Sequence, residues 1–151
     1  MSLYIGLKLV HLLAVVMMIG ATIINGLLHG LAVKATPSEA STLTHAVGMV
    51  NRRVMLPSFV VLPLSGAALT VWSGYAWTEF WIVLGLGLTA ALVLAFAVGA
   101  RLEARLNTAA QTAERQLPPA YFKTFKRAAP IGAGALILSL ITLWVMIAKP
   151  V

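Results

Sequence analysis

The sequence contains no cysteine and no aspartate, and charged residues make up only 10% of its 151 residues. The absence of cysteine excludes disulfides, iron–sulfur clusters, thiolate metal sites and a cysteine nucleophile. The acidic side chains are Glu39, Glu79, Glu103 and Glu114. So few carboxylates disfavour both a carboxylate-rich metal site and a hydrolase that uses two carboxylates.

Apolar residues dominate instead, since 60% of the chain is hydrophobic. Four apolar stretches, at about residues 3–24, 54–72, 80–100 and 128–148, are long enough to cross a hydrocarbon core of about 30 Å at about 1.5 Å per residue. We therefore predict an all-α, polytopic membrane protein. Residues 1–151 form a single domain, a bundle of four transmembrane helices with cytoplasmic helical extensions.

The second helix is expected to begin well before its apolar stretch. Thr36 can cap a helix, Pro37 lacks the N–H that would be unpaired at the first position, and Glu39 completes a capping box. Pro57 and Pro63 are expected to kink the helix where it crosses the membrane.

Basic residues gather on one side of the predicted bundle. Nine of the eleven Lys and Arg residues lie in or beside the two long connections: Lys34, Arg52, Arg53, Arg101, Arg105, Arg115, Lys123, Lys126 and Arg127. The positive-inside rule then places both long connections in the cytoplasm and both termini in the periplasm. Because membrane topology accounts for the net charge of +7, we expect no nucleic-acid partner.

Lys8 and His11 are ionisable residues inside the first apolar stretch, and their spacing places them on one helix face. Ionisable groups at membrane depth are costly and normally face the bundle interior. Imidazole is a ligand for iron, copper or zinc, and a buried histidine in a helix bundle commonly holds haem. Two alternatives stay open: a His11 hydrogen-bonded to a hydroxyl or a backbone carbonyl, with Lys8 reaching the outer surface, or a role in proton transfer. Polar residues at similar depth on the other helices are Thr70, Thr89, Ser139 and Thr142.

A second group of candidate residues lies near the predicted cytoplasmic edge. His29 is five helical turns from His11, about 27 Å along the axis, so the two cannot bind one metal. His29 and His45 come to similar levels on antiparallel helices, where they are placed to approach each other. Arg52 and Arg53 would then supply cations for haem propionates or lipid phosphates. The alternative is that both histidines are solvated and that the two arginines only set the topology.

Four motifs run through the chain: Lys8-x-x-His11, Pro57 with Pro63-x-Ser65-Gly66, Leu117-Pro118-Pro119-x-Tyr121, and Trp144-x-Met146-x-x-Ala148-Lys149-Pro150. Through them the chain resembles, over nearly its whole length, a bacterial family of predicted integral membrane proteins of unknown function. This resemblance implies a four-helix protein of the bacterial inner membrane and supplies no activity.

The first helix carries a further pattern, Tyr4-x-x-x-Lys8-x-x-His11-x-x-Ala14-Val15-Val16-x-x-x-Gly20. This pattern is similar to the opening helix of the J-type protoporphyrinogen oxidases and of the copper-resistance D membrane proteins. The resemblance implies that His11 is a ligand of haem b and that Lys8 is its companion. Residues 25–29 differ from the basic and aromatic signature of the oxidases, so their activity is not carried over.

These observations lead to one main hypothesis and two alternatives. The protein is expected to bind haem b, or less favourably copper, through His11 for electron transfer or tetrapyrrole-linked redox chemistry. The first alternative is a cofactor-free accessory or scaffold subunit of a larger membrane complex, and the second is a small transporter. The expected partners are the lipid bilayer and either a homo-oligomer or that larger complex. Rows of small residues such as Gly26-x-x-x-Gly30 favour close helix packing within the bundle over a dimer face.

Overall fold

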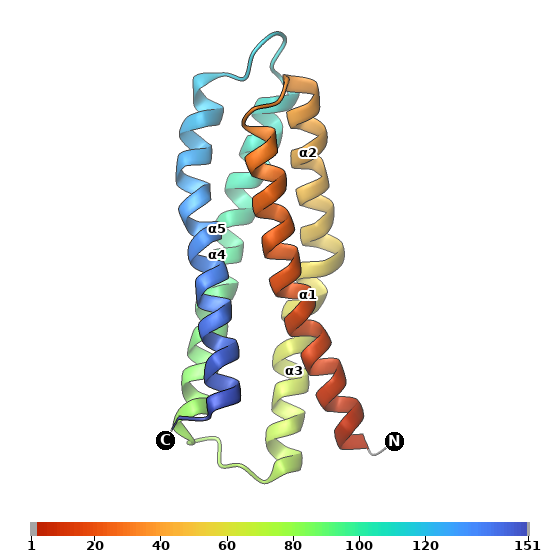
Figure 1. The fold of residues 1–151 in the computed structure, drawn as a ribbon, viewed down its shortest axis with the longest axis vertical. Helices are drawn as coiled ribbons and strands as arrows, with labels where there is room; N and C mark the ends of the chain where they lie inside the picture. The colour runs from red at the N-terminus through yellow and green to blue at the C-terminus, as the bar shows by residue number, and fades with distance from the viewer. Residues whose placement is uncertain (1–2, 151) are drawn as a thin grey trace.

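The computed structural model describes residues 3–150, which form an elongated bundle of helices (Figure 1). The elements are α1 (Leu3–Ala32), α2 (Pro37–Val50), η1 (Asn51–Met55), α3 (Leu56–Ser73), α4 (Phe80–Gln111) and α5 (Pro119–Ala148). Residues 3–150 contain no strand. The segments long and apolar enough to cross a membrane are Leu3–Ala32, Pro37–Ser73, Phe80–Gln111 and Pro119–Ala148. The prediction of an all-α membrane protein with four spans is confirmed.

The long helix Pro37–Ser73 begins where the sequence predicts. The backbone N–H and the hydroxyl of Thr36 both donate to the Glu39 carboxylate, at 2.9 and 2.8 Å. The irregularity expected from the prolines takes the form of η1, a π-helical turn that ends just before Leu56 and Pro57. Proline has no N–H for the carbonyl four residues earlier, and a π turn is one way for a helix to absorb the missing bond. Helix α3 continues through Pro63.

The apolar side chains of these helices point mostly outward. Only 17% to 22% of the most hydropathic stretch of each helix is buried. Large side chains such as Leu64, Leu94 and Ile147 are 66%, 68% and 74% exposed. Such a surface is unfavourable in water but matches the hydrocarbon of a bilayer. The outward faces of the bundle therefore face lipid.

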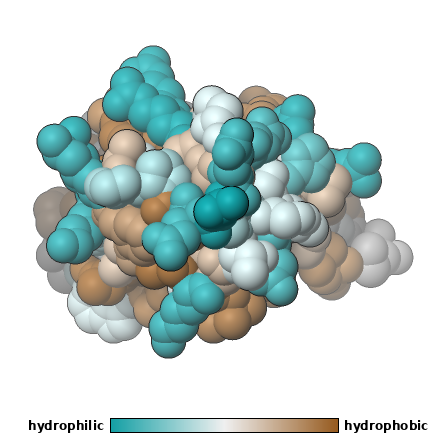
Figure 2. Space-filling model, turned by 90° about the horizontal axis from the view of Figure 1, so that it is seen from above, coloured by the Kyte–Doolittle hydropathy of each residue, from teal (hydrophilic) through white to brown (hydrophobic). Residues whose placement is uncertain are grey.

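The most tightly packed region lies at the end of the bundle opposite the termini. There α1, α2, α4 and α5 meet around a cluster of residues that are at most 2% exposed: Ala32, Ala40, Leu106, Ala110 and Tyr121. Alanines allow the helix backbones to approach closely. Figure 2 looks onto this end and shows hydrophilic side chains spread across it. The close packing expected at Gly26 and Gly30 is not formed, because a Cβ at either position would meet no atom within 4 Å.

Towards the termini the bundle separates into two helix pairs. Helix α1 packs on α3, helix α4 packs on α5, and α3 barely touches α4. Figure 1 shows the two pairs moving apart towards the end that carries both the N- and the C-terminus. This separation leaves a cavity between the two helix pairs.

Candidate functional site

A cavity of about 440 Å³ lies between the two helix pairs, and we call it the His11 cavity. Its lining includes six residues singled out in the sequence: Lys8, His11, Thr70, Thr89, Ser139 and Thr142. They come from α1, α3, α4 and α5. These residues, which the sequence places at similar depth, therefore line one cavity.

A hydrogen bond holds the imidazole ring of His11 against α3. Its Nδ1 lies 2.9 Å from Oγ of Ser65. The Ser65 hydroxyl donates to the Val61 carbonyl at 2.6 Å, so its oxygen is left to accept from Nδ1–H. A neutral ring with its proton on Nδ1 keeps a lone pair on Nε2. The hydrogen bond to a hydroxyl expected of a structural histidine is present, and the same bond is the one that orients metal-bound histidines.

Four hydroxyl groups in the His11 cavity are already engaged. A Cβ on Gly66 would lie 3.3 Å from Cε1 of His11, so the glycine lets the ring approach α3 closely. The hydroxyls of Thr70, Thr89, Ser139 and Thr142 each donate to a carbonyl of their own helix. Their protons are therefore not free to bond Nε2 of His11.

Two cations lie at the end of the His11 cavity nearest the termini. Lys8 is exposed and lines the cavity. Lys149 also lines it, donates from Nζ to the Tyr75 hydroxyl at 2.8 Å, and lies 4.4 and 5.0 Å from the ring centroids of Tyr75 and Trp81. Aromatic rings attract a cation through their negative faces. Lys149 thus joins Lys8 as a fixed positive charge beside this cavity, a role that sequence reasoning missed.

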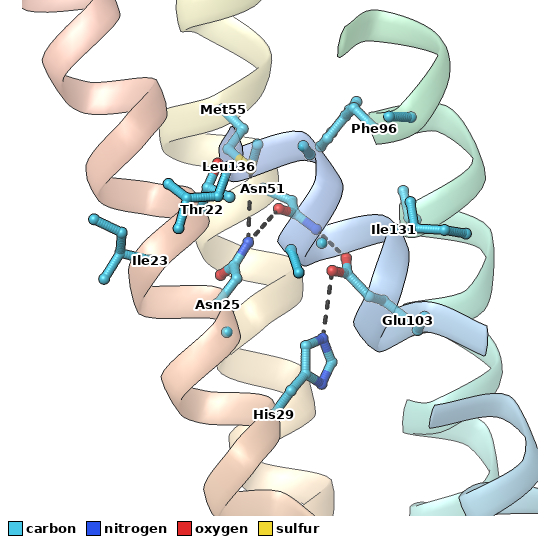
Figure 3. Close-up of a pocket in the computed structure, with 18 of the residues that line it drawn as sticks. Thr22, Ile23, Asn25, His29, Asn51, Met55, Phe96, Glu103, Ile131 and Leu136 are labelled. Carbon is cyan, nitrogen blue, oxygen red and sulfur yellow. Dashed lines mark hydrogen bonds and ion pairs between the residues drawn. The ribbon is translucent and has the colours of Figure 1, made fainter. Parts of the chain in front are cut away.

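A second cavity, of about 350 Å³, contains a hydrogen-bonded chain of side chains from α1, η1 and α4, and we call it the Glu103 cavity (Figure 3). The amide nitrogen of Asn25 donates to Oδ1 of Asn51 at 2.8 Å and also contacts the Met55 sulfur at 3.6 Å. The amide nitrogen of Asn51 donates to the Glu103 carboxylate. Nε2 of His29 lies 3.3 Å from the other carboxylate oxygen. The side chains of His29 and Glu103 are 12% and 18% exposed, so this pair is largely withdrawn from solvent.

Three candidate residues, His45, Arg52 and Arg53, lie outside both cavities. His29 pairs with Glu103, whereas His45 is exposed on α2. Arg52 and Arg53 are exposed on η1, where Nε of Arg52 donates to the Gly48 carbonyl at 3.3 Å. Within residues 3–150 no group of three or more potential metal-ligating side chains comes together. The structure unites Lys8 with His11 and leaves His45, Arg52 and Arg53 apart from them.

Sequence reasoning missed Asn25, Asn51 and Glu103 as members of a site. The available signals were the four-residue spacing of Asn25 and His29, which puts them on one helix face, and the position of Glu103 just beyond an apolar stretch. Neither signal says which residues of different helices meet. The meeting depends on how each helix is rotated about its own axis.

The sequence profile of a family described as predicted integral membrane protein (DUF2269) matches residues 5–150. No curated protein and no solved structure matches the chain. The match covers nearly the whole chain and carries no activity with it.

Proposed function

Since the chain belongs to the DUF2269 family of predicted integral membrane proteins, we propose a function from its geometry: it holds one b-type haem in the His11 cavity and serves in electron transfer. The observation that carries this proposal is the hydrogen bonding of His11. With Nδ1–H given to Ser65, the nitrogen Nε2 would be free to bind the haem iron. A structural histidine needs no cavity beside it, whereas a ligand does.

The residues around the His11 cavity fit this group. Cofactor sites are typically cavities of about 300 to 1,000 Å³ with mostly apolar walls and a few polar groups, and this cavity measures about 440 Å³. Lys8 and Lys149 line its end and are suited to pair with the two propionates. They take the place that sequence reasoning gave to Arg52 and Arg53.

When bound, the haem supplies one-electron redox chemistry, and the chain supplies its surroundings. His11 binds, Ser65 orients the imidazole, and apolar walls exclude water. Met146 lines the same cavity and packs against the backbone of α4, since a Cβ on Gly85 would lie 1.8 Å from its methyl carbon. Its thioether is the side chain in this cavity to test as a second ligand of the haem iron.

The orientation is part of the same proposal. The basic connections at the end opposite the termini favour the cytoplasm of a bacterial cell, with both termini in the periplasm. The His11 cavity then lies towards the periplasmic face of the inner membrane, and the Glu103 cavity lies nearer the cytoplasm.

Absorption spectra of the detergent-purified protein, oxidised and dithionite-reduced, test the haem proposal. After expression with ample haem we expect a Soret band in the wild type and in His29→Ala and His45→Ala. The band should be absent in His11→Ala. His45→Ala is the matched control, because the same substitution is made at an exposed site outside both cavities.

Two outcomes would overturn the proposal. A wild-type protein without a Soret band rules out bound haem, and a band that persists in His11→Ala rules out His11 as its ligand. A colourless protein that co-purifies with another membrane protein in a fixed ratio supports the cofactor-free scaffold instead. In Met146→Leu, a Soret band that keeps the wild-type position would exclude the thioether as second ligand.

A further inference from the structure

The direction of every hydrogen bond in the chain from Asn25 through Asn51 and Glu103 to His29 follows from one group, the Glu103 carboxylate. A carboxylate only accepts hydrogen bonds, so Asn51 must turn its NH₂ group towards Glu103. The carbonyl oxygen of Asn51 then accepts from the NH₂ group of Asn25. His29 likewise gives its Nε2–H to Glu103, which leaves Nδ1 of a neutral ring as an acceptor.

Two acceptor atoms, one at each end of this hydrogen-bonded chain, have no donor within residues 3–150. Oδ1 of Asn25 and Nδ1 of His29 are both buried and have no hydrogen-bond partner among the described residues. Asn25 as a whole is only 6% exposed, and Figure 3 shows its oxygen turned away from Asn51. Both residues line the cavity. Because buried polar groups are normally paired, a molecule that donates hydrogen bonds is what the site lacks.

The walls of the Glu103 cavity indicate which kind of hydrogen-bond donor would fit it. They include the aromatic pair Phe59 and Phe96, whose ring centroids are 5.1 Å apart, and a third aromatic ring, Phe125. Flat aromatic ligands pack well against such rings. Ile23 and Leu27 also line the cavity and are 46% and 65% exposed on the apolar surface of α1. The cavity therefore reaches the lipid-facing side of the bundle.

We infer that the Glu103 cavity binds a membrane-soluble hydroquinone, an aromatic diol with an apolar tail. Its hydroxyl groups donate to the free acceptors of Asn25 and His29, its ring lies against the phenylalanines, and its tail leaves towards the lipid. Phenols donate strongly, because their pKa of about 10 makes them far more acidic than water. The oxidised quinone has carbonyl oxygens only, which accept hydrogen bonds. It therefore cannot donate to the acceptor atoms of Asn25 and His29.

Calorimetric titration of the full-length protein in detergent, under anaerobic conditions, tests this inference with decylubiquinol and decylubiquinone as probes. We expect saturable binding of the quinol and binding of the quinone at least about tenfold weaker, since a site built to pair with hydroxyl groups rejects the analogue that lacks them. Asn25→Leu should weaken quinol binding by a similar factor. His45→Ala should leave it unchanged, because His45 is exposed and lines neither cavity.

Gly99→Leu provides a test that leaves the hydrogen-bonded chain untouched. Gly99 lines the Glu103 cavity, and a Cβ there would meet no atom within 4 Å, so a leucine side chain has room to start into the cavity. Gly87→Leu on the same helix is the matched control, since Gly87 is exposed, has equally open space and lines neither cavity.

The expected result is that quinol binding is lost in Gly99→Leu and kept in Gly87→Leu. No saturable quinol binding, as for a cavity that holds only water or a lipid chain, would overturn the inference. Equal binding by Gly99→Leu and the wild type would place the ligand elsewhere, and tighter binding of the quinone would reverse the hydrogen-bond argument. Absence of a Soret band has no bearing on these results, so this inference and the haem proposal fail separately.

Discussion

Replacing Asn51 by leucine removes the central link of the chain from Asn25 to Glu103. The substitution eliminates the bond from Asn25 and the bond to Glu103 at nearly constant side-chain volume. Side-chain hydrogen bonds in membrane proteins contribute about 0.6 kcal/mol on average and about 1.7 kcal/mol at most. Two bonds therefore amount to about 1 to 3.5 kcal/mol. Since Glu103 is 18% exposed and keeps His29 as a partner, we expect a loss of about 1 to 2 kcal/mol.

Reversible unfolding of the purified protein in mixed micelles with increasing SDS, followed by circular dichroism, measures this loss. Asn107→Leu is the matched control, because Asn107 lies outside both cavities and accepts from Thr44 at 3.1 Å in a half-buried position. We expect it to cost about 0.6 kcal/mol or less. The double variant Asn51→Leu/Glu103→Leu should cost less than the sum of its single variants by about 0.6 to 1.7 kcal/mol. Additive costs, or equal losses in Asn51→Leu and Asn107→Leu, would refute the proposed coupling.

Three further predictions address the His11 ring, the packed end of the bundle and the orientation. Ser65→Ala removes the acceptor that orients His11, so haem should transfer to apomyoglobin about 10- to 100-fold more readily; unchanged transfer would contradict this role. Tyr121→Phe deletes a buried hydroxyl that has no partner within residues 3–150 and should leave the melting temperature unchanged or higher, whereas Tyr121→Ala should cost about 3 to 5 kcal/mol; a clear loss in Tyr121→Phe would mean that the hydroxyl is bonded. A reporter active only in the periplasm, fused after Val151, should be active, and activity of a cytoplasmic reporter there would reverse the orientation.

The features predicted correctly from the sequence depend on neighbouring residues or on distance along a helix. The capping contact between Thr36 and Glu39 needs only three residues of separation. The polar lining around His11 follows from counting inward along antiparallel helices at about 1.5 Å per residue, which gives depth without any knowledge of packing. Depth alone was enough to select Thr70 and Thr142, which line the same cavity as His11.

The features that were missed depend on how each helix is rotated. Helices that are apolar nearly all round show no strong stripe of buried residues, so the sequence pattern cannot say which face turns inward. Helix α2 turns Thr44 and Val47 inward, with exposed fractions of 3% and 0%. That rotation leaves His45 on the outside, and His29 meets Glu103 of α4 instead. The same uncertainty hid the contact between His11 and Ser65.

The boundary between the two cavities bears on the transporter alternative. Three residues line both cavities: Met18, Leu92 and Ser139. They are 4%, 4% and 3% exposed. The Ser139 hydroxyl is used by the Leu136 carbonyl at 2.7 Å. A polar solute that moved from one cavity to the other past these residues would lose hydrogen bonds beside the two apolar side chains, which costs several kcal/mol for each unpaired group. Two adjoining cavities whose shared wall is buried and mostly apolar are better suited to two bound molecules than to a passage, and this is why we favour the proposed haem and hydroquinone over transport.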